Sequence, residues 1–183
     1  MTETLSPALT GEIEQRVEQV LAAACQQEVM LATAESCTGG LLASLLTDVE
    51  GRSHAFDRGF VTYTDEAKHE LLGVSRETLG RFGAVSETSA REMAEGAIAN
   101  SQATLAVSIT GFAGAGGPDD EPGLVHFAIA ERDRETRHVV HHFGDLGRGP
   151  VRVACLETAL DLFAEALEAR AGGTNGQQAL TAM

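Results

Sequence analysis

Apolar side chains recur every three or four residues in several segments of the chain, which is the spacing of amphipathic helices. The first segment carries Ile13, Val17 and Val20, and Ser6-Pro7 ahead of it predicts the start of a helix. The helix expected after Ser86 has an apolar stripe of mostly small residues, so it should pack closely on a sheet. Further helices are expected from Leu41, from Asp65 to a close at Gly73, and from Pro150.

Short apolar runs between these segments predict strands. They cover residues 29–34, 59–64, 105–109, 124–130 and 137–143. The first run is nearly continuous, as in a strand that helices cover on both faces. The last two runs are joined by a short charged segment, so they should form an antiparallel hairpin whose second strand lies at an edge or faces solvent. Alternating helices and strands predict a layered α/β domain.

Composition and charge narrow the class of protein. A chain of 183 residues with 43% hydrophobic and 22% charged residues is typical of one globular domain. Its formal net charge of −14 leaves no basic face for nucleic acid. No apolar run approaches the ~20 residues of a membrane span, and residues 1–4 lack the basic start of a signal peptide, which indicates a cytoplasmic protein. Residues 1–170 should form the domain, and residues 171–183, which have no apolar period, a mobile tail.

Cysteines and histidines show no pattern typical of a metal site or a disulfide frame. Cys25, Cys37 and Cys155 lie far apart and include no CxxC pair. Three histidines cluster within residues 138–142, but no carboxylate or cysteine stands beside them at the spacing of metal ligands. No metal site is therefore expected.

The chemistry is expected at one end of the sheet. Ligands of open α/β sheets gather beyond the carboxyl ends of the strands, so the loops after Ala34, Thr64 and Thr110 should converge on one crevice. The glycine-rich loop at residues 111–117 matches neither a P-loop nor a dinucleotide fingerprint. ATP hydrolysis is therefore not expected.

Ser36 is a candidate nucleophile because it stands where the first strand turns into a helix. Backbone amides at a helix start can hold an oxyanion, and here they belong to Cys37, Thr38, Gly39 and Gly40. A second interpretation stays open on the residues alone. In that interpretation Ser36 or Thr38 simply serves as the helix cap, and the two glycines permit a tight turn.

An activated serine needs a base, and Lys68 is the candidate. It is the only lysine in the chain, and a lysine can lose its proton when burial lowers its pKa, whereas arginine cannot. The alternative is a surface lysine paired with Asp65. Tyr63, the only tyrosine, could donate a proton through its hydroxyl or stack in the core. His54 is the one histidine near these loops.

Two arginines flank Pro150 at the start of the last helix. Arg148 and Arg152, together with that helix terminus, could hold a dianionic phosphate. A spacing of four residues on a helix equally suits ordinary surface arginines.

Five motifs in the same order resemble the CinA C-terminal-domain family, the bacterial nicotinamide-nucleotide amidases. They are Thr33-Ala34-Glu35-Ser36-Cys37-Thr38-Gly39-Gly40, Gly59-Phe60-Val61-Thr62-Tyr63-Thr64-Asp65-Glu66-Ala67-Lys68, Leu71-Leu72-Gly73-Val74, Gly83-Ala84-Val85-Ser86-Glu87 and Ser108-Ile109-Thr110-Gly111-Phe112-Ala113-Gly114. The resemblance implies a three-layer α/β/α sandwich with a mixed central sheet, usually as a homodimer. It also implies hydrolysis of the carboxamide of nicotinamide mononucleotide to nicotinate mononucleotide and ammonia, without a cofactor.

The resemblance also implies roles for single residues. The family's serine, lysine and tyrosine fall on Ser36, Lys68 and Tyr63, and Thr110 and Gly111 fall near the nucleotide. An arginine at the last helix, Arg148 or Arg152, is implied as the phosphate partner. The glycine-rich loop departs from the family pattern, because Ala115 follows Gly114 where a proline is common.

Two rival functions remain to be distinguished. In the first, Cys37 replaces Ser36 as the attacking atom of the same kind of amidase. In the second, the chain is a catalytically silent module that binds a nucleotide or regulates a partner.

Overall fold

The computed structural model describes residues 10–118 and 120–181. The helix start expected at Ser6-Pro7 therefore lies outside the described residues. The helices are α1 (Gly11–Gln26), α2 (Leu41–Leu46), α3 (Asp65–Leu72), α4 (Arg76–Phe82), α5 (Glu87–Ala99) and α6 (Arg148–Thr181), with a short 3-10 helix at Ser53–Ala55. The strands are β1 (Leu31–Glu35), β2 (Phe56–Val61), β3 (Leu105–Gly111), β4 (Leu124–Glu131) and β5 (Arg137–His142).

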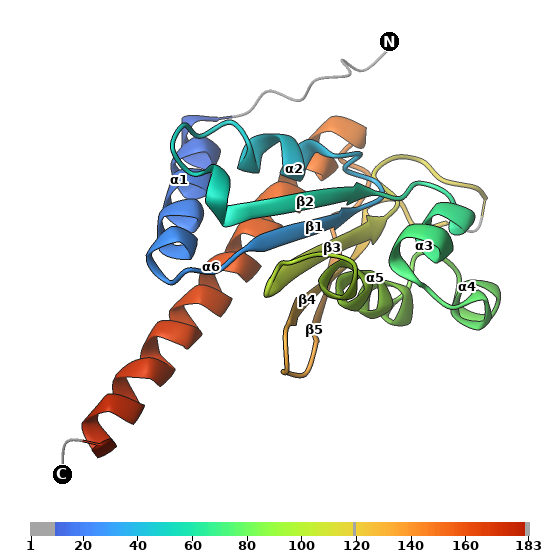
Figure 1. Cartoon of the computed structure of the whole chain (residues 1–183). Coiled ribbons are helices and arrows are strands. Elements are labelled where there is room, and N and C mark those ends of the chain that lie inside the picture. The colour runs from blue at the N-terminus through green and yellow to red at the C-terminus, as the bar shows by residue number, and fades with distance from the viewer. Residues whose placement is uncertain (1–9, 119, 182–183) are drawn as a thin grey trace.

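The five strands form one mixed sheet in the order β2-β1-β3-β4-β5. β1 runs parallel to both of its neighbours, β2 and β3, whereas β3, β4 and β5 pair as antiparallel neighbours. The expected hairpin and edge strand are thus confirmed. The carboxyl ends of β1, β2 and β3 meet at one edge of the sheet, beside α3 and α4 (Figure 1).

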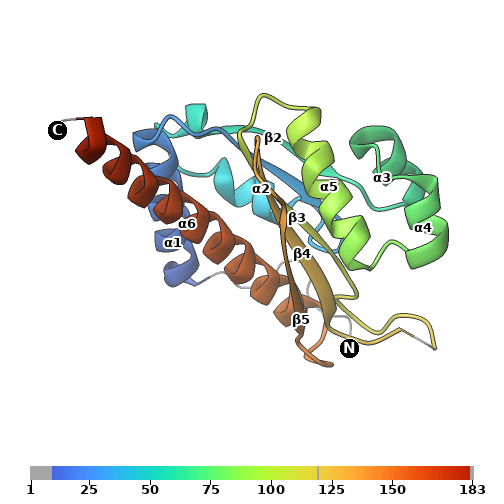
Figure 2. The same cartoon turned by 90° about the horizontal axis from the view of Figure 1, so that it is seen from below.

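Helices cover both faces of this sheet, which confirms the three-layer sandwich. α1 and α6 lie on one face, and α5, with α3 and α4 beyond it, lies on the other (Figure 2). Large aliphatic side chains of β1, β3 and β4 point toward α1 and α6. On the other face the strands present alanines, which let α5 come close.

The small-residue stripe of α5 packs on that alanine face, as expected. Ala90, Met93, Ala94 and Ala97 are all fully buried there. The contact is close enough that the hydroxyl of Ser108 donates to the backbone carbonyl of Ala90 at 2.6 Å.

α5 also holds α3 in place. A Cβ atom at Gly96 would lie 1.9 Å from the backbone carbonyl oxygen of Leu72, the last residue of α3. Because this distance is far below van der Waals contact, only glycine allows the two helices to approach so closely.

Several boundaries differ from the sequence prediction. β2 begins at Phe56, three residues before the expected start, because an edge strand needs no continuous apolar run. Thr64, not Asp65, caps α3, since its hydroxyl accepts the amide of Ala67. α6 begins at Arg148, ahead of Pro150.

The helix α4 and the end of α6 also depart from the elements expected from the sequence. α4 was not predicted from the sequence. It starts at a Ser75 cap and has no apolar stripe, burying Thr78 only. α6 continues as far as Thr181, and the mobility expected of the segment from residue 171 stays a prediction. None of the helices in the described part of the chain has the length and apolar character needed to cross a membrane.

Candidate active site

Ser36 lies directly after β1, at the carboxyl edge of the sheet. Its backbone amide donates to the carbonyl oxygen of Ile109 in β3 at 2.9 Å, so the neighbouring strand fixes the start of the turn. The residue is nearly buried, with 8% of its surface exposed.

Lys68 reaches Ser36 from α3. Its Nζ atom lies 3.0 Å from Ser36 Oγ and donates to the carbonyl oxygen of Thr62 at 2.9 Å. The side chain is fully buried, with 0% exposed, so it is not the surface lysine of the alternative interpretation. The predicted proximity of the two residues, 32 positions apart in sequence, is confirmed.

Burial also prepares Lys68 chemically. Desolvation disfavours the charged ammonium and lowers the pKa of Lys68 from its ordinary 10.5, while the carboxylate of Asp65 opposes that shift. A neutral amine 3.0 Å from a hydroxyl can accept its proton. The pair therefore has the geometry and the direction of pKa shift of a nucleophile and its base.

The last residue of β1, Glu35, was missed by sequence reasoning. Its carboxylate is fully buried and accepts four hydrogen bonds. Three come from backbone amides at the start of α2, those of Gly40, Leu42 and Ala43. The signal available in the sequence was a carboxylate that ends an apolar run just before a glycine-rich helix start.

These bonds correct the predicted set of oxyanion donors. The amide of Gly40 is already bonded to Glu35, and the amide of Gly39 donates to the carbonyl oxygen of Ser36 at 3.1 Å. Neither is free for a substrate. The amides of Cys37 and Thr38 donate to no backbone carbonyl oxygen among the described residues, so the possible oxyanion donors narrow to these two.

The Cys37 side chain belongs to the buried apolar core that α1 and α6 cover. It is 5% exposed and lies against the thiol of Cys155, whose hydrogen bond lowers the pKa of Cys37. The same hydrogen bond, followed by burial, raises the pKa of Cys155. A thiol packed in this way is poorly placed to attack a substrate that reaches Ser36.

The two candidate arginines have different positions. Arg152 Nη2 donates to the carbonyl oxygen of Thr38 at 2.5 Å, and its buried Nε atom has no hydrogen-bond partner within the described chain. Arg148 is exposed at the first position of α6. Its Cβ atom would lie 3.6 Å from a Cβ at Gly114, so α6 begins beside the glycine-rich loop.

Three other predicted residues have plain structural positions. The hydroxyl of Thr110 donates to the carbonyl oxygen of Ala84 at 2.8 Å and so ties β3 to the loop ahead of α5. Gly111 leaves no room for a side chain, because a Cβ there would lie 2.6 Å from the carbonyl oxygen of Leu124. Tyr63 is 66% exposed, so the interpretation that it stacks in the core is wrong, and it makes no hydrogen bond with any described residue.

No histidine side chain is hydrogen-bonded to Ser36 or Lys68 among the described residues. His54 is exposed in the 3-10 helix before β2, at the opposite end of that strand from Thr62. His126 Nδ1 and His138 Nε2 face each other at 3.0 Å. Within residues 10–118 and 120–181, no group of three or more His, Cys, Asp or Glu side chains is arranged to hold a metal ion.

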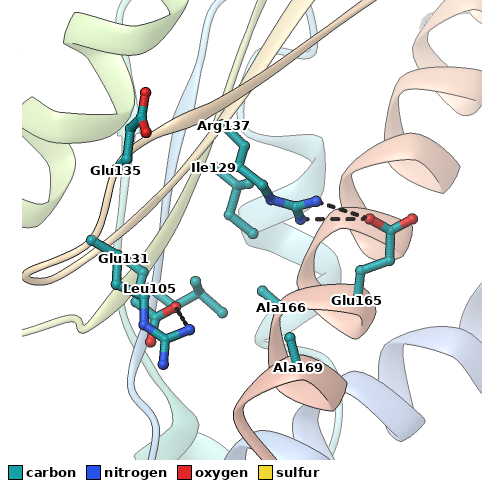
Figure 3. Close-up of a pocket in the computed structure, with 9 residues that line it drawn as sticks. Leu105, Ile129, Glu131, Glu135, Arg137, Glu165, Ala166 and Ala169 are labelled. Atoms are coloured by element: carbon teal, nitrogen blue, oxygen red, sulfur yellow. Dashed lines mark hydrogen bonds and ion pairs between the residues drawn. The ribbon is translucent and has the colours of Figure 1, made fainter. Parts of the chain in front are cut away.

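A cavity of about 220 Å³ lies at the other end of the sheet, between the β4–β5 hairpin and α6 (Figure 3). Four of its charged lining residues form ion pairs, Arg137 with Glu165 at 3.4 Å and Arg134 with Glu131 at 3.3 Å. Leu105, at the amino end of β3, forms part of its wall. This cavity is therefore remote from Ser36 and contributes nothing to its chemistry.

Comparison with known proteins identifies relatives over most of the chain. The model of the CinA C-terminal domain matches residues 13–167. A nicotinamide-nucleotide amidohydrolase PncC from Enterobacter agglomerans is 50% identical over 71% of this chain and 82% of its own length. A CinA-like protein from Akkermansia muciniphila is 53% identical over 61% of this chain, and the chain spans only 28% of that relative's length.

Solved structures show the same fold. The competence/damage-inducible protein CihA from Agrobacterium tumefaciens superposes with a TM-score of 0.83 at 44% identity, covering 88% of this chain and 98% of that one. A CinA superfamily protein from Escherichia coli gives 0.77 at 36% identity, covering 84% and 91%. The ordered motifs, the sheet topology and these matches agree, and the chain belongs to the CinA C-terminal domain family.

Proposed function

We propose that this chain hydrolyses the carboxamide of nicotinamide mononucleotide to nicotinate mononucleotide and ammonia. The observation that carries the proposal is the contact of 3.0 Å between the buried Lys68 Nζ and Ser36 Oγ. The name of the Enterobacter agglomerans relative, a nicotinamide-nucleotide amidohydrolase, supports the choice of substrate.

In the proposed mechanism the neutral amine of Lys68 takes the hydroxyl proton of Ser36 as Oγ bonds to the amide carbon. The backbone amides of Cys37 and Thr38 hold the negative charge that develops on the amide oxygen. Lys68 then returns the proton to the nitrogen, the C–N bond breaks, and ammonia leaves an acyl-enzyme. Tyr63 is the alternative donor of that proton. Water, activated in the same way by Lys68, hydrolyses the ester and regenerates Ser36.

Substrate binding is assigned from position. Arg148 stands exposed beside the glycine-rich loop, and we assign it to the phosphate of the nucleotide. Arg152 donates to the carbonyl oxygen of Thr38 and supports the turn. The mechanism uses no metal or cofactor.

The proposed assembly is a homodimer. Val61, Tyr63 and Leu71 expose 49%, 66% and 48% of their surface on β2, α3 and the segment between them. Exposed apolar side chains on these consecutive segments suit contact with a second copy of the chain. Light scattering in solution tests the assembly, and a monomeric mass at micromolar concentration would contradict it.

An ammonia-release assay tests the function on three compounds, nicotinamide mononucleotide, nicotinamide riboside and nicotinamide. We expect release from the mononucleotide, and its loss in both Ser36→Ala and Lys68→Met. Ser44→Ala, at an exposed serine of α2, is the matched control and should keep wild-type activity. Tight nucleotide binding without turnover in calorimetry would instead favour the silent module.

A further inference from the structure

Glu35 stands next to the proposed nucleophile but points away from the reacting atoms. Its side chain is fully buried, and its two oxygens accept four hydrogen bonds. We propose that Glu35 is a positioning residue that shapes the oxyanion hole, an inference that rests on the proposed function.

The four bonds divide evenly between the two carboxylate oxygens. Oε2 accepts the amides of Gly40 at 3.0 Å and Leu42 at 3.1 Å. Oε1 accepts the amide of Ala43 at 2.8 Å and the hydroxyl of Thr33 at 3.2 Å. The side chain thus joins the end of β1 to the first turn of α2 and closes residues 35–40 into a small ring.

Glycine conformation makes that ring possible. Gly39 and Gly40 have φ values of 63° and 89°, in the left-handed region that favours glycine. The chain therefore doubles back, and the Gly40 amide returns to the carboxylate five residues earlier.

The ring decides which amides stay available. The amides of Gly39 and Leu41 donate to carbonyl oxygens within the turn, and those of Gly40, Leu42 and Ala43 donate to the Glu35 carboxylate. Only the two amides that follow Ser36 donate neither to a backbone carbonyl oxygen nor to Glu35 among the described residues. From the other side of the turn, a guanidinium of α6 fixes the Thr38 carbonyl at 2.5 Å. Glu35 and Arg152 thus hold the turn from two sides, and the amides of Cys37 and Thr38 are the donors that we assign to the oxyanion.

A purely electrostatic effect of the Glu35 carboxylate on the oxyanion would change the rate in the opposite direction to a positioning role. A carboxylate beside a developing oxyanion opposes the charge, so removing it should speed the reaction. If Glu35 acts by position, Glu35→Gln should slow the reaction. The amide isostere puts an NH₂ group where an acceptor stood, facing backbone N–H donors that it cannot satisfy. The two roles therefore predict opposite signs for one substitution.

The test compares Glu35→Gln with a matched variant, Glu92→Gln. The Glu92 carboxylate performs the same local task at α4, accepting the Ser75 amide at 2.7 Å and the Thr78 hydroxyl at 2.6 Å, in a different part of the fold. Both variants lose a carboxylate that holds the start of a short helix. Only the first should affect the turn after Ser36.

We expect kcat of Glu35→Gln to fall by about 10²-fold with KM within about twofold, as for a misplaced oxyanion donor. Glu92→Gln should keep both constants even where its melting temperature falls by a similar amount. The full-length chain is used, and circular dichroism verifies that each variant is folded. A kcat for Glu35→Gln equal to or above that of the wild type, or a rise in KM alone, overturns the proposal.

Glu35→Asp serves if the glutamine variant does not fold. It keeps the charge but is one methylene shorter, so it cannot reach both sets of donors, and the same loss in kcat is expected. If neither variant folds, Glu35 is a determinant of folding and the proposal is overturned. The rate at which a fluorophosphonate modifies Ser36 provides a second readout. That rate should fall in parallel with kcat, and it stays measurable even if the wild type releases no ammonia, a result that would refute the proposed function alone.

Discussion

Replacing Lys68 by methionine removes the amine and little else. Both side chains are long and unbranched, so Met fills most of the buried space that the lysine occupies. What is lost is the base 3.0 Å from Ser36 Oγ and the hydrogen bond of 2.9 Å to the Thr62 carbonyl.

The expected loss of activity follows from that missing base. A positioned general base contributes about 10²- to 10⁴-fold to a rate. At about 1.4 kcal/mol per tenfold, Lys68→Met should raise the activation free energy by about 2.7–5.4 kcal/mol. Lys68→Arg should be equally inactive, because a guanidinium keeps the charge but cannot accept the proton.

The free energy of unfolding should change with pH in a diagnostic way. Burial holds the pKa of Lys68 below 10.5 in the folded protein, so between that lowered value and 10.5 the unfolded chain binds the extra proton. The contribution of Lys68 to the free energy of unfolding is therefore lowest at a pH below its folded-state pKa. It rises as the pH increases from that pKa to 10.5. The slope is at most about 1.4 kcal/mol per pH unit, because one proton is involved. Lys68→Met lacks this group.

Urea unfolding of both proteins across pH 7–10.5 isolates the effect, since every other titrating group is common to the two. The stability of the wild type relative to Lys68→Met should increase with pH. At neutral pH Lys68→Met leaves the Thr62 carbonyl without its hydrogen bond, which costs about 1–3 kcal/mol. Removal of the buried amine offsets this cost, because the variant has no amine to desolvate. Parallel curves for the two proteins, or ammonia release by Lys68→Met above a tenth of the wild-type rate, would refute the role of a buried neutral base.

Other substitutions test the surrounding structure. Arg148→Ala should raise KM for nicotinamide mononucleotide by roughly 10- to 100-fold, the effect of losing one charge-assisted bond, and leave KM for nicotinamide riboside unchanged in the same assay. Cys37→Ala keeps the backbone amide and should retain ammonia release, whereas a thiol nucleophile would leave only background. Gly96→Ala should destabilise by more than about 3 kcal/mol in chemical unfolding, because its Cβ would lie 1.9 Å from a backbone oxygen of α3. Gly80→Ala, in open space on α4, should stabilise by about 0.5–1 kcal/mol.

The strand-turn-helix around Ser36 could be predicted because its signals are local. An apolar run, a serine and two glycines follow one another within a dozen residues. Lys68 could be predicted as its partner because parallel strands bring their following segments to one edge of the sheet. Both inferences need only the order of elements.

The order of elements does not predict the proposed role of Glu35, nor does it distinguish the positions of Arg148 and Arg152. Glu35 looks like a polar residue ending a strand, and its function depends on the path of the next eight residues. Arg152 bonds to a carbonyl 114 positions away, a contact that its spacing from Arg148 does not reveal. α4 was missed for a related reason, since it is held by a Ser75 cap and by Glu92 and not by an apolar stripe.

Burial of Lys68 by helix packing affects its pKa more than any neighbouring charge does. Desolvation is the main cause of the lowered pKa of Lys68, and the nearby carboxylate of Asp65 works against it. That desolvation requires α3 to stay packed closely against α5. The close contact at Leu72 is possible because Gly96 has no side chain. A folded Gly96→Ala protein should therefore admit water to the amine, raise its pKa, and shift the ascending limb of the kcat/KM–pH profile to higher pH. A profile unchanged in position would show that the amine owes its pKa to its immediate contacts alone.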